Sequence, residues 1–133
     1  MVYEIDGTRF STLEEFFAEF NRVLVPDSDL LLSNLDAFDD VLSGGCGTPD
    51  DGFTLRWKNH RISKQRLGYA ETVRQLELRL ARCHPESRPQ VAQDLKQAQA
   101  EQGPTVFDWL TEIINDHGPG GRYATDRVDL LLD

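Results

Sequence analysis

Disulfide bonds, metal clusters and membrane spans are the features that this sequence is least equipped to form. The chain has two cysteines, Cys46 and Cys83, and no Cys-x-x-Cys pair. We therefore expect two reduced thiols, with no disulfide and no zinc site. No stretch approaches the roughly 18 apolar residues that a membrane span needs, and residues 1–5 have neither a basic flank nor a long apolar run. A cytoplasmic protein with no membrane partner is expected.

Positive charge is absent from a long part of the chain. Between Val23 and Leu55 there are seven aspartates and no lysine or arginine, whereas residues 56–103 carry ten basic and five acidic side chains. The net charge of -9 argues against binding of a nucleic-acid backbone and favours either a basic partner or simple solubility. With 133 residues, the chain is long enough for a single domain over 1–133 that buries its own core.

Hydrophobic periodicity and turn residues predict a mixed α/β fold. Apolar residues alternate over residues 2–5 and recur at helical spacing over five segments. A short run of β-formers around Arg56 predicts a second strand, and the apolar residues after Gly120 and Gly121 predict a last one. Strands are expected at 2–5, 53–57 and 128–132, and helices at about 12–25, 34–43, 69–83, 89–100 and 105–114. Because helices separate the strands, we expect a small three-stranded parallel sheet packed with helices, with the middle strand buried by them.

A short acidic helix is the most unusual part of the pattern. Leu35, Phe38 and Leu42 share one face at helical spacing, whereas Asp36 and Asp40 stand one turn apart on another. Like charges at this spacing destabilise an isolated helix by about 0.2 to 0.5 kcal/mol per pair. The face is either a solvated surface, which is the common case, or a surface for a basic partner.

The residues of known enzyme motifs are not found at the required spacings. The glycines of residues 44–52 match neither a phosphate-binding loop nor a dinucleotide fingerprint, and the three histidines are far apart in the sequence. The carboxylates of Asp36, Asp39 and Asp40 are of the type that serves as acid and base residues or as ligands of a divalent ion. They lie on one helix, whereas such sites gather carboxylates across a cleft. We therefore expect no enzyme activity, no cofactor and no metal.

Several ordered motifs resemble the barstar family of intracellular ribonuclease inhibitors. The Asn-Leu-Asp-Ala-Phe run is similar to the second helix of that family, and the resemblance extends over most of the chain. It is carried by residues 34–38, 44–49, 53–57, 63–65 and 105–109 and by the C-terminal strand. The resemblance implies a barstar-like fold in which residues of about 69–101 are a helical insertion.

The resemblance also implies which residues meet a partner. The acidic contact positions of the family's second helix match Asp36 and Asp40, a further acidic contact matches Glu112, and the glycine that ends the helix matches Gly44. The sequence departs from the family at two places. One is Asp39, which stands where the type member has a tryptophan. The other is the apolar segment Leu30, Leu31 and Leu32, which replaces two tyrosines and a glycine and either touches a partner or packs into the core.

Two functions remain open after this comparison. The first is an inhibitor that binds a basic, secreted-type ribonuclease and blocks its active site with the acidic helix, because carboxylates can occupy sites built for phosphates. The second is a barstar-like interaction module for a basic partner that is not a nuclease. Both predict a protein partner and no direct binding of nucleic acid.

Overall fold

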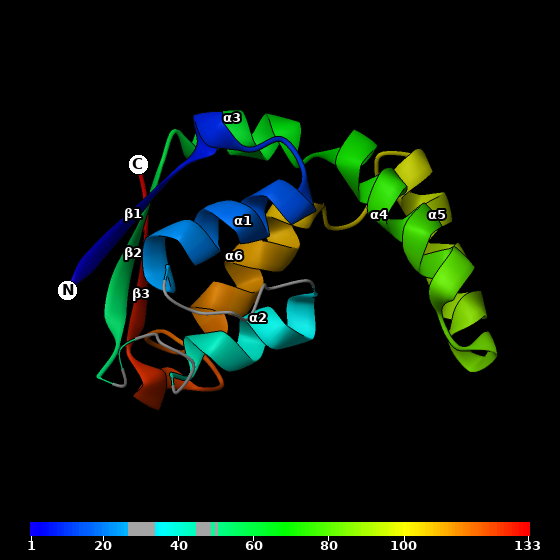
Figure 1. The fold of residues 1–133 in the computed structure, drawn as a ribbon. Helices are drawn as coiled ribbons and strands as arrows, with labels where there is room; N and C mark the ends of the chain where they lie inside the picture. Colours follow the sequence, from blue (N-terminus) through cyan, green and yellow to red (C-terminus); the bar gives the residue numbers. More distant parts are fainter. Residues whose placement is uncertain (27–33, 45–48, 50) are drawn as a thin grey trace.

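The computed structural model describes residues 1–26, 34–44, 49 and 51–133. Leu30, Leu31 and Leu32, and Cys46, lie outside the described residues, so the expectations for them are not tested here. The strands and helices follow one another along the chain as shown in Figure 1. They are β1 (Val2–Asp6), α1 (Leu13–Leu24), α2 (Leu35–Leu42), β2 (Phe53–Lys58), α3 (His60–Arg66), α4 (Tyr69–Arg82), α5 (Arg88–Gln99), α6 (Val106–Asp116) and β3 (Val128–Leu132). Three short 3-10 turns complete them: η1 (Gly7–Arg9), η2 (Pro85–Ser87) and η3 (Ala124–Asp126).

The three strands form one parallel sheet, which confirms the predicted fold class. The strand order is β1-β2-β3, so β2 lies in the middle and pairs with both neighbours. Ile5 is opposite Trp57, and Trp57 is opposite Leu132. Helices α1, α2 and α6 all lie on the same side of this sheet (Figure 1).

The middle strand corrects one expectation, because its burial alternates. Phe53, Leu55 and Trp57 are buried, whereas Thr54 and Arg56 are only partly buried. Arg56 forms ion pairs with Glu4 of β1 and with Asp133 beyond β3. The prediction that helices bury this strand is wrong for its second face, which carries the ion pairs of Arg56.

An aromatic cluster fills the space between the sheet and the helices. Phe10, Phe16, Phe20, Phe38 and Trp57 are each at most 1% exposed. The ring of Trp57 contacts those of Phe10, Phe16 and Phe107 at centroid distances of 5.3 to 5.9 Å. Its indole N–H donates to the buried Ser63 Oγ at 2.9 Å, so the polar edge of this large side chain is satisfied.

Side-chain caps begin two of the predicted helices, α1 and α6. Thr12 accepts from the backbone N–H of Glu15, and Thr105 forms a reciprocal capping box with Asp108. One helix was missed, because α3 has a single strongly apolar residue, Ile62, and begins after Asn59 without a side-chain cap. The repeated apolar spacing that predicted the other helices is absent there.

Helices α4 and α5 form a hairpin that extends away from the sheet (Figure 1). A second, small apolar cluster of Leu76, Val91 and Ala98 holds its two helices together. Helix α5 therefore packs on α4, outside the main core. That the hairpin is an insertion within one domain stays a prediction.

The base of the hairpin is attached to α1 by a buried carboxylate. Glu71 is 6% exposed, and its Oε2 accepts from the backbone N–H of Leu13 at 2.8 Å. Arg74 donates to Glu71 and also pairs with Glu14. These contacts satisfy a backbone donor at the start of α1 and give the hairpin a defined orientation at its base.

Candidate protein-binding site

Helix α2 carries the predicted acidic face, and its own sequence explains its start and its end. The Asn34 side chain accepts from the N–H of Ala37 at 2.7 Å, which caps the first turn. Gly44 has φ of 90°, a left-handed conformation that glycine adopts without strain, and its N–H bonds the carbonyl of Val41 at 3.1 Å. Gly44 therefore ends the helix, as expected for this position.

The two faces of α2 differ as the spacing predicts. Phe38 and Leu42 are 0% and 2% exposed and belong to the main core, and Leu35 packs against it. Asp36 and Asp40 are exposed, and neither forms an ion pair with another described residue. The helix is thus held by its apolar face and presents two unpaired carboxylates to solvent.

Asp39 has a different environment, which the sequence did not reveal. Its Oδ1 lies 2.6 Å from Nε2 of His117, a residue that is 1% exposed at the end of α6. The other ring nitrogen, Nδ1, lies 2.7 Å from Oδ2 of Asp126. Tyr123 stacks on the ring at a centroid distance of 5.2 Å. Asp39 therefore joins α2 to α6 and to η3.

Ser43 completes this histidine cluster, and its geometry is not that of a hydrolase. Its hydroxyl lies 3.4 Å from Nδ1 of His117 but donates to Oδ2 of Asp126 at 2.9 Å. A catalytic histidine needs a free nitrogen lone pair directed at the serine, whereas Nδ1 here faces the Asp126 carboxylate. The cluster supplies no activated serine.

Asp126 contributes to the acid dependence of folding. The hydrogen bond with His117 lowers the pKa of the Asp126 carboxyl below its ordinary value, partial burial opposes the change, and Ser43 adds to the lowering. A carboxyl whose pKa is lower in the folded state stabilises the fold above its unfolded pKa, which is about 3.9. This contribution is lost as the pH falls through the folded-state pKa.

We therefore expect Asp126→Asn to be less stable than the wild type at neutral pH and to approach it in acid. The free energy of unfolding, measured by urea denaturation at several pH values from about 7 down to about 3, checks this. The neighbouring Asp129, exposed on β3, provides the control Asp129→Asn. A stability difference for Asp126→Asn that does not change with pH would contradict the assignment.

Glu112 lies beside α2, although the two are far apart in the sequence. It is exposed on α6 and lines a groove together with Leu35 of α2, Trp109 and Ile113. Arg79 of α4 reaches the same groove, with its guanidinium 5.2 Å from the centre of the Trp109 ring. The structure thus brings Glu112 next to the acidic helix and adds Arg79, which sequence reasoning did not single out.

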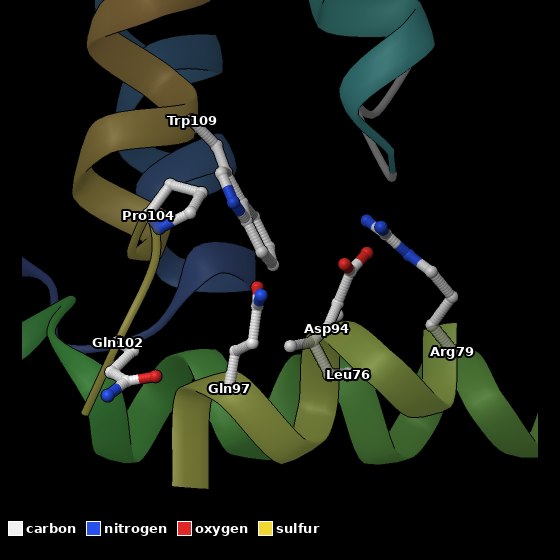
Figure 2. Close-up of a pocket in the computed structure, with 7 residues that line it drawn as sticks. All are labelled: Leu76, Arg79, Asp94, Gln97, Gln102, Pro104 and Trp109. Atoms are coloured by element: carbon white, nitrogen blue, oxygen red, sulfur yellow. The ribbon is translucent and has the colours of Figure 1, made fainter. Parts of the chain in front are cut away.

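Trp109 and Arg79 also line a second cavity, which lies between the α4–α5 hairpin and α6. Figure 2 shows Trp109 of α6 facing Gln97, with Asp94 and Arg79 on the adjoining wall. This cavity of about 120 Å³ is also lined by Leu76, Gln102 and Pro104. Trp109 of α6 therefore packs against the hairpin and also lines the groove next to α2.

The residues that the structure describes contain no group of three or more histidine, cysteine or acidic side chains arranged to hold a metal ion. No helix in the described ranges is long and apolar enough to cross a membrane. The predicted site residues that can be placed are Asp36, Asp39, Asp40 and Gly44 on or next to α2, and Glu112 across the groove. Nothing in the structure tests whether they meet a partner.

Part of the chain matches a known protein family. Residues 1–90 match the family Barstar, described as barnase inhibitor. The match includes β1, α2 and β2, and it covers more than half of the chain. The chain therefore belongs to the barstar family. Searches of curated proteins and of solved structures found no match.

Proposed function

We propose that this protein inhibits a basic ribonuclease by placing the acidic face of α2 in the active site of the enzyme. The observation that carries the proposal is the pair of exposed carboxylates of Asp36 and Asp40, on a helix fixed by the buried Phe38 and Leu42. Membership of the barnase-inhibitor family supports it. The protein is then a binding protein without catalytic activity, and it acts in the cytoplasm.

The mechanism follows from the chemistry of the target. A ribonuclease binds the RNA backbone in a cleft rich in arginine, lysine and histidine, and carboxylates can form the charge-assisted hydrogen bonds that phosphates would form. Asp36 and Asp40 are one turn apart, so both can enter one cleft. The net charge of -9 also attracts a basic partner over longer distances and accelerates association at low salt.

The surface around α2 supplies further contacts in this proposal. Glu112 across the groove adds a third carboxylate, and Gly44 permits close approach of backbone at the end of the helix. Leu30, Leu31 and Leu32 lie outside the described residues, and their place in the sequence immediately before α2 is the reason to propose them as apolar contacts. Asp39 has one carboxylate oxygen on His117, and its side chain is still 41% exposed, so its other oxygen can contact the partner.

One observation favours the alternative of an interaction module for a basic partner that is not a nuclease. Where the resemblance places an aromatic contact residue, this chain has Asp39, and that residue is bound to His117. Buried aromatic anchors often carry much of the affinity of an interface. A partner that relies on such an anchor would therefore bind this chain less tightly.

Titration of barnase with the purified protein tests the proposal. Hydrolysis of a fluorogenic RNA substrate should fall as the protein is added, inhibition should be competitive with substrate, and higher salt should slow association. The protein alone should hydrolyse neither RNA nor nucleotides, with or without Mg²⁺. If neither barnase nor other small basic ribonucleases are inhibited at about 10 μM protein, the ribonuclease assignment is wrong and the alternative remains.

A further inference from the structure

The α4–α5 hairpin places one basic side chain next to the acidic helix. The groove beside α2 is lined by three apolar residues, two carboxylates and one arginine, namely Leu35, Trp109, Ile113, Glu112, Asp116 and Arg79. Arg79 belongs to α4, whereas Leu35 is the first residue of α2. The groove therefore joins the hairpin to the surface proposed for the partner, and a partner that covers both α2 and the groove meets Arg79.

The guanidinium of Arg79 is held in place but keeps its donors free. It lies 5.2 Å from the centre of the Trp109 ring, and Figure 2 shows the side chain pointing away from the helices of the hairpin. Arg79 is exposed, and within the described ranges it forms no hydrogen bond and no ion pair. Arg74 on the same helix differs, because Glu14 and Glu71 bind its guanidinium. Arg79 is thus available to a group from another molecule.

The base of the hairpin fixes where Arg79 stands. The backbone N–H of Val106 donates to Oγ1 of Thr72 at 2.9 Å, and the Tyr69 hydroxyl donates to the carbonyl of Gly103 at 2.9 Å. Together with Glu71 on the N–H of Leu13, these bonds attach α4 to both α6 and α1. A side chain on an anchored helix, stacked on a tryptophan, loses less freedom on binding than a mobile one.

The acidic residues near Arg79 leave it unneutralised. Asp94 lines the adjoining cavity, but its Oδ1 accepts from Nε2 of Gln90 at 2.9 Å. Glu112 and Asp116 are one turn apart on α6 and, like the two carboxylates of α2, suit basic groups of a partner. A basic cleft placed on this surface therefore meets carboxylates at several points and one cation at Arg79.

The sign of this charge restricts what the partner can place there. A lysine or arginine opposite Arg79 would be repelled, and a purely apolar group would remove water from the guanidinium without replacing its hydrogen bonds. A carboxylate fits best, because the planar guanidinium can donate two parallel hydrogen bonds to its two oxygens.

We infer that Arg79 is a specificity-determining contact, which binds the carboxylate of an aspartate or glutamate on a loop at the rim of the partner's basic cleft. This inference rests on the proposed function, because it concerns the same complex with a ribonuclease. The hairpin then acts as a second arm beside α2. A basic ribonuclease with an acidic residue at this place is bound more tightly than one with a neutral or basic residue there.

Charge reversal at two positions of α4 tests the contact. Arg79→Glu and Arg82→Glu change the net charge equally, and Arg82 is exposed at the end of α4 and lines neither the groove nor the cavity. In a titration of barnase, Arg82→Glu should bind as the wild type does or up to about threefold more tightly, because a more acidic protein attracts a basic enzyme more strongly. Arg79→Glu should instead bind about 10- to 100-fold more weakly. Urea denaturation of each variant alone checks that both remain folded.

A charge swap then identifies the group that meets Arg79. Each aspartate and glutamate at the rim of the barnase cleft is replaced singly by lysine. One of these replacements should restore binding to Arg79→Glu by about tenfold or more and should weaken binding to the wild type. The same replacement should not improve binding to Arg82→Glu to a similar extent.

Equal affinities of Arg79→Glu and Arg82→Glu would overturn the contact. Tighter binding by Arg79→Glu than by Arg82→Glu would show that a basic group occupies the groove, and failure of every lysine replacement to restore binding would exclude a carboxylate. Each of these results leaves inhibition by the wild type intact. If the wild type inhibits neither barnase nor another small basic ribonuclease, the proposed function fails, and the Arg79 contact fails with it.

Discussion

Asp40→Ala and Asp36→Ala are each expected to weaken the complex with a basic ribonuclease by about 30-fold to several thousand-fold. This range corresponds to about 2 to 5 kcal/mol, the cost of removing one partner from a desolvated charge pair, much of it from the charge left unpaired on the other protein. The range comes from charged interfaces in general, with barnase and its inhibitor as a prominent example. Isothermal titration of barnase with each variant at two ionic strengths checks it.

Asp129→Ala is the matched control for these two variants. Asp129 is exposed on β3 and belongs to the opposite face of the sheet from the α2 side, but its replacement removes the same charge. A loss of affinity confined to Asp36→Ala and Asp40→Ala supports direct contact. Equal small losses for all three would indicate long-range attraction only, and no loss would mean that the acidic helix is a solvated face.

Folding should respond to the aspartates of α2 in different ways. Asp36 and Asp40 repel each other at a spacing of one turn, so replacing either should leave stability unchanged or raise it by about 0.2 to 0.5 kcal/mol. Asp39→Ala should instead destabilise the protein, because it removes the acceptor from Nε2 of the buried His117. The three neighbouring acidic residues thus have two different roles, which spacing alone did not separate.

The sequence predicted those parts of the fold that depend on local patterns. Thr12 and Thr105 mark the starts of two helices by side-chain caps, and the apolar spacing of Phe38 and Leu42 indicated which face of α2 is buried. The exposure of Asp36 and Asp40 follows from the same spacing. Each of these signals lies within a few residues of the feature it predicts.

The features that were missed depend on pairing between distant residues. His117 lies 78 positions from Asp39 in the sequence, and its own neighbours give no sign of a carboxylate contact. The open face of β2 was missed because Arg56 is neutralised by Glu4 and Asp133, both of which come from other strands or their ends. Arg79 reaches the groove next to α2 from the hairpin, which Glu71 and other contacts attach to the rest of the fold. Such contacts are set by tertiary structure.

Phe38→Ala is expected to lower the free energy of unfolding by about 3 to 5 kcal/mol. The Phe38 side chain is fully buried, and its ring lies 5.0 Å from that of Phe20 and 5.4 Å from that of Phe16, measured between centroids. Alanine would leave a cavity where three aromatic rings now meet, on the helix that presents Asp36 and Asp40. Urea denaturation followed by tryptophan fluorescence measures the loss, and Phe38→Leu, with a smaller change in volume, should lose less.

The same substitution separates the support of α2 from its binding chemistry. Phe38 lies on the core side, so Phe38→Ala should weaken ribonuclease binding only by loosening the helix. Excess ribonuclease should then restore much of the lost stability, because a ligand that binds only the folded state stabilises it in proportion to its concentration. Asp40→Ala should show the opposite behaviour, with near-normal stability alone and little stabilisation by the ribonuclease. An unchanged urea midpoint for Phe38→Ala would mean that this ring does not hold the acidic helix on the core.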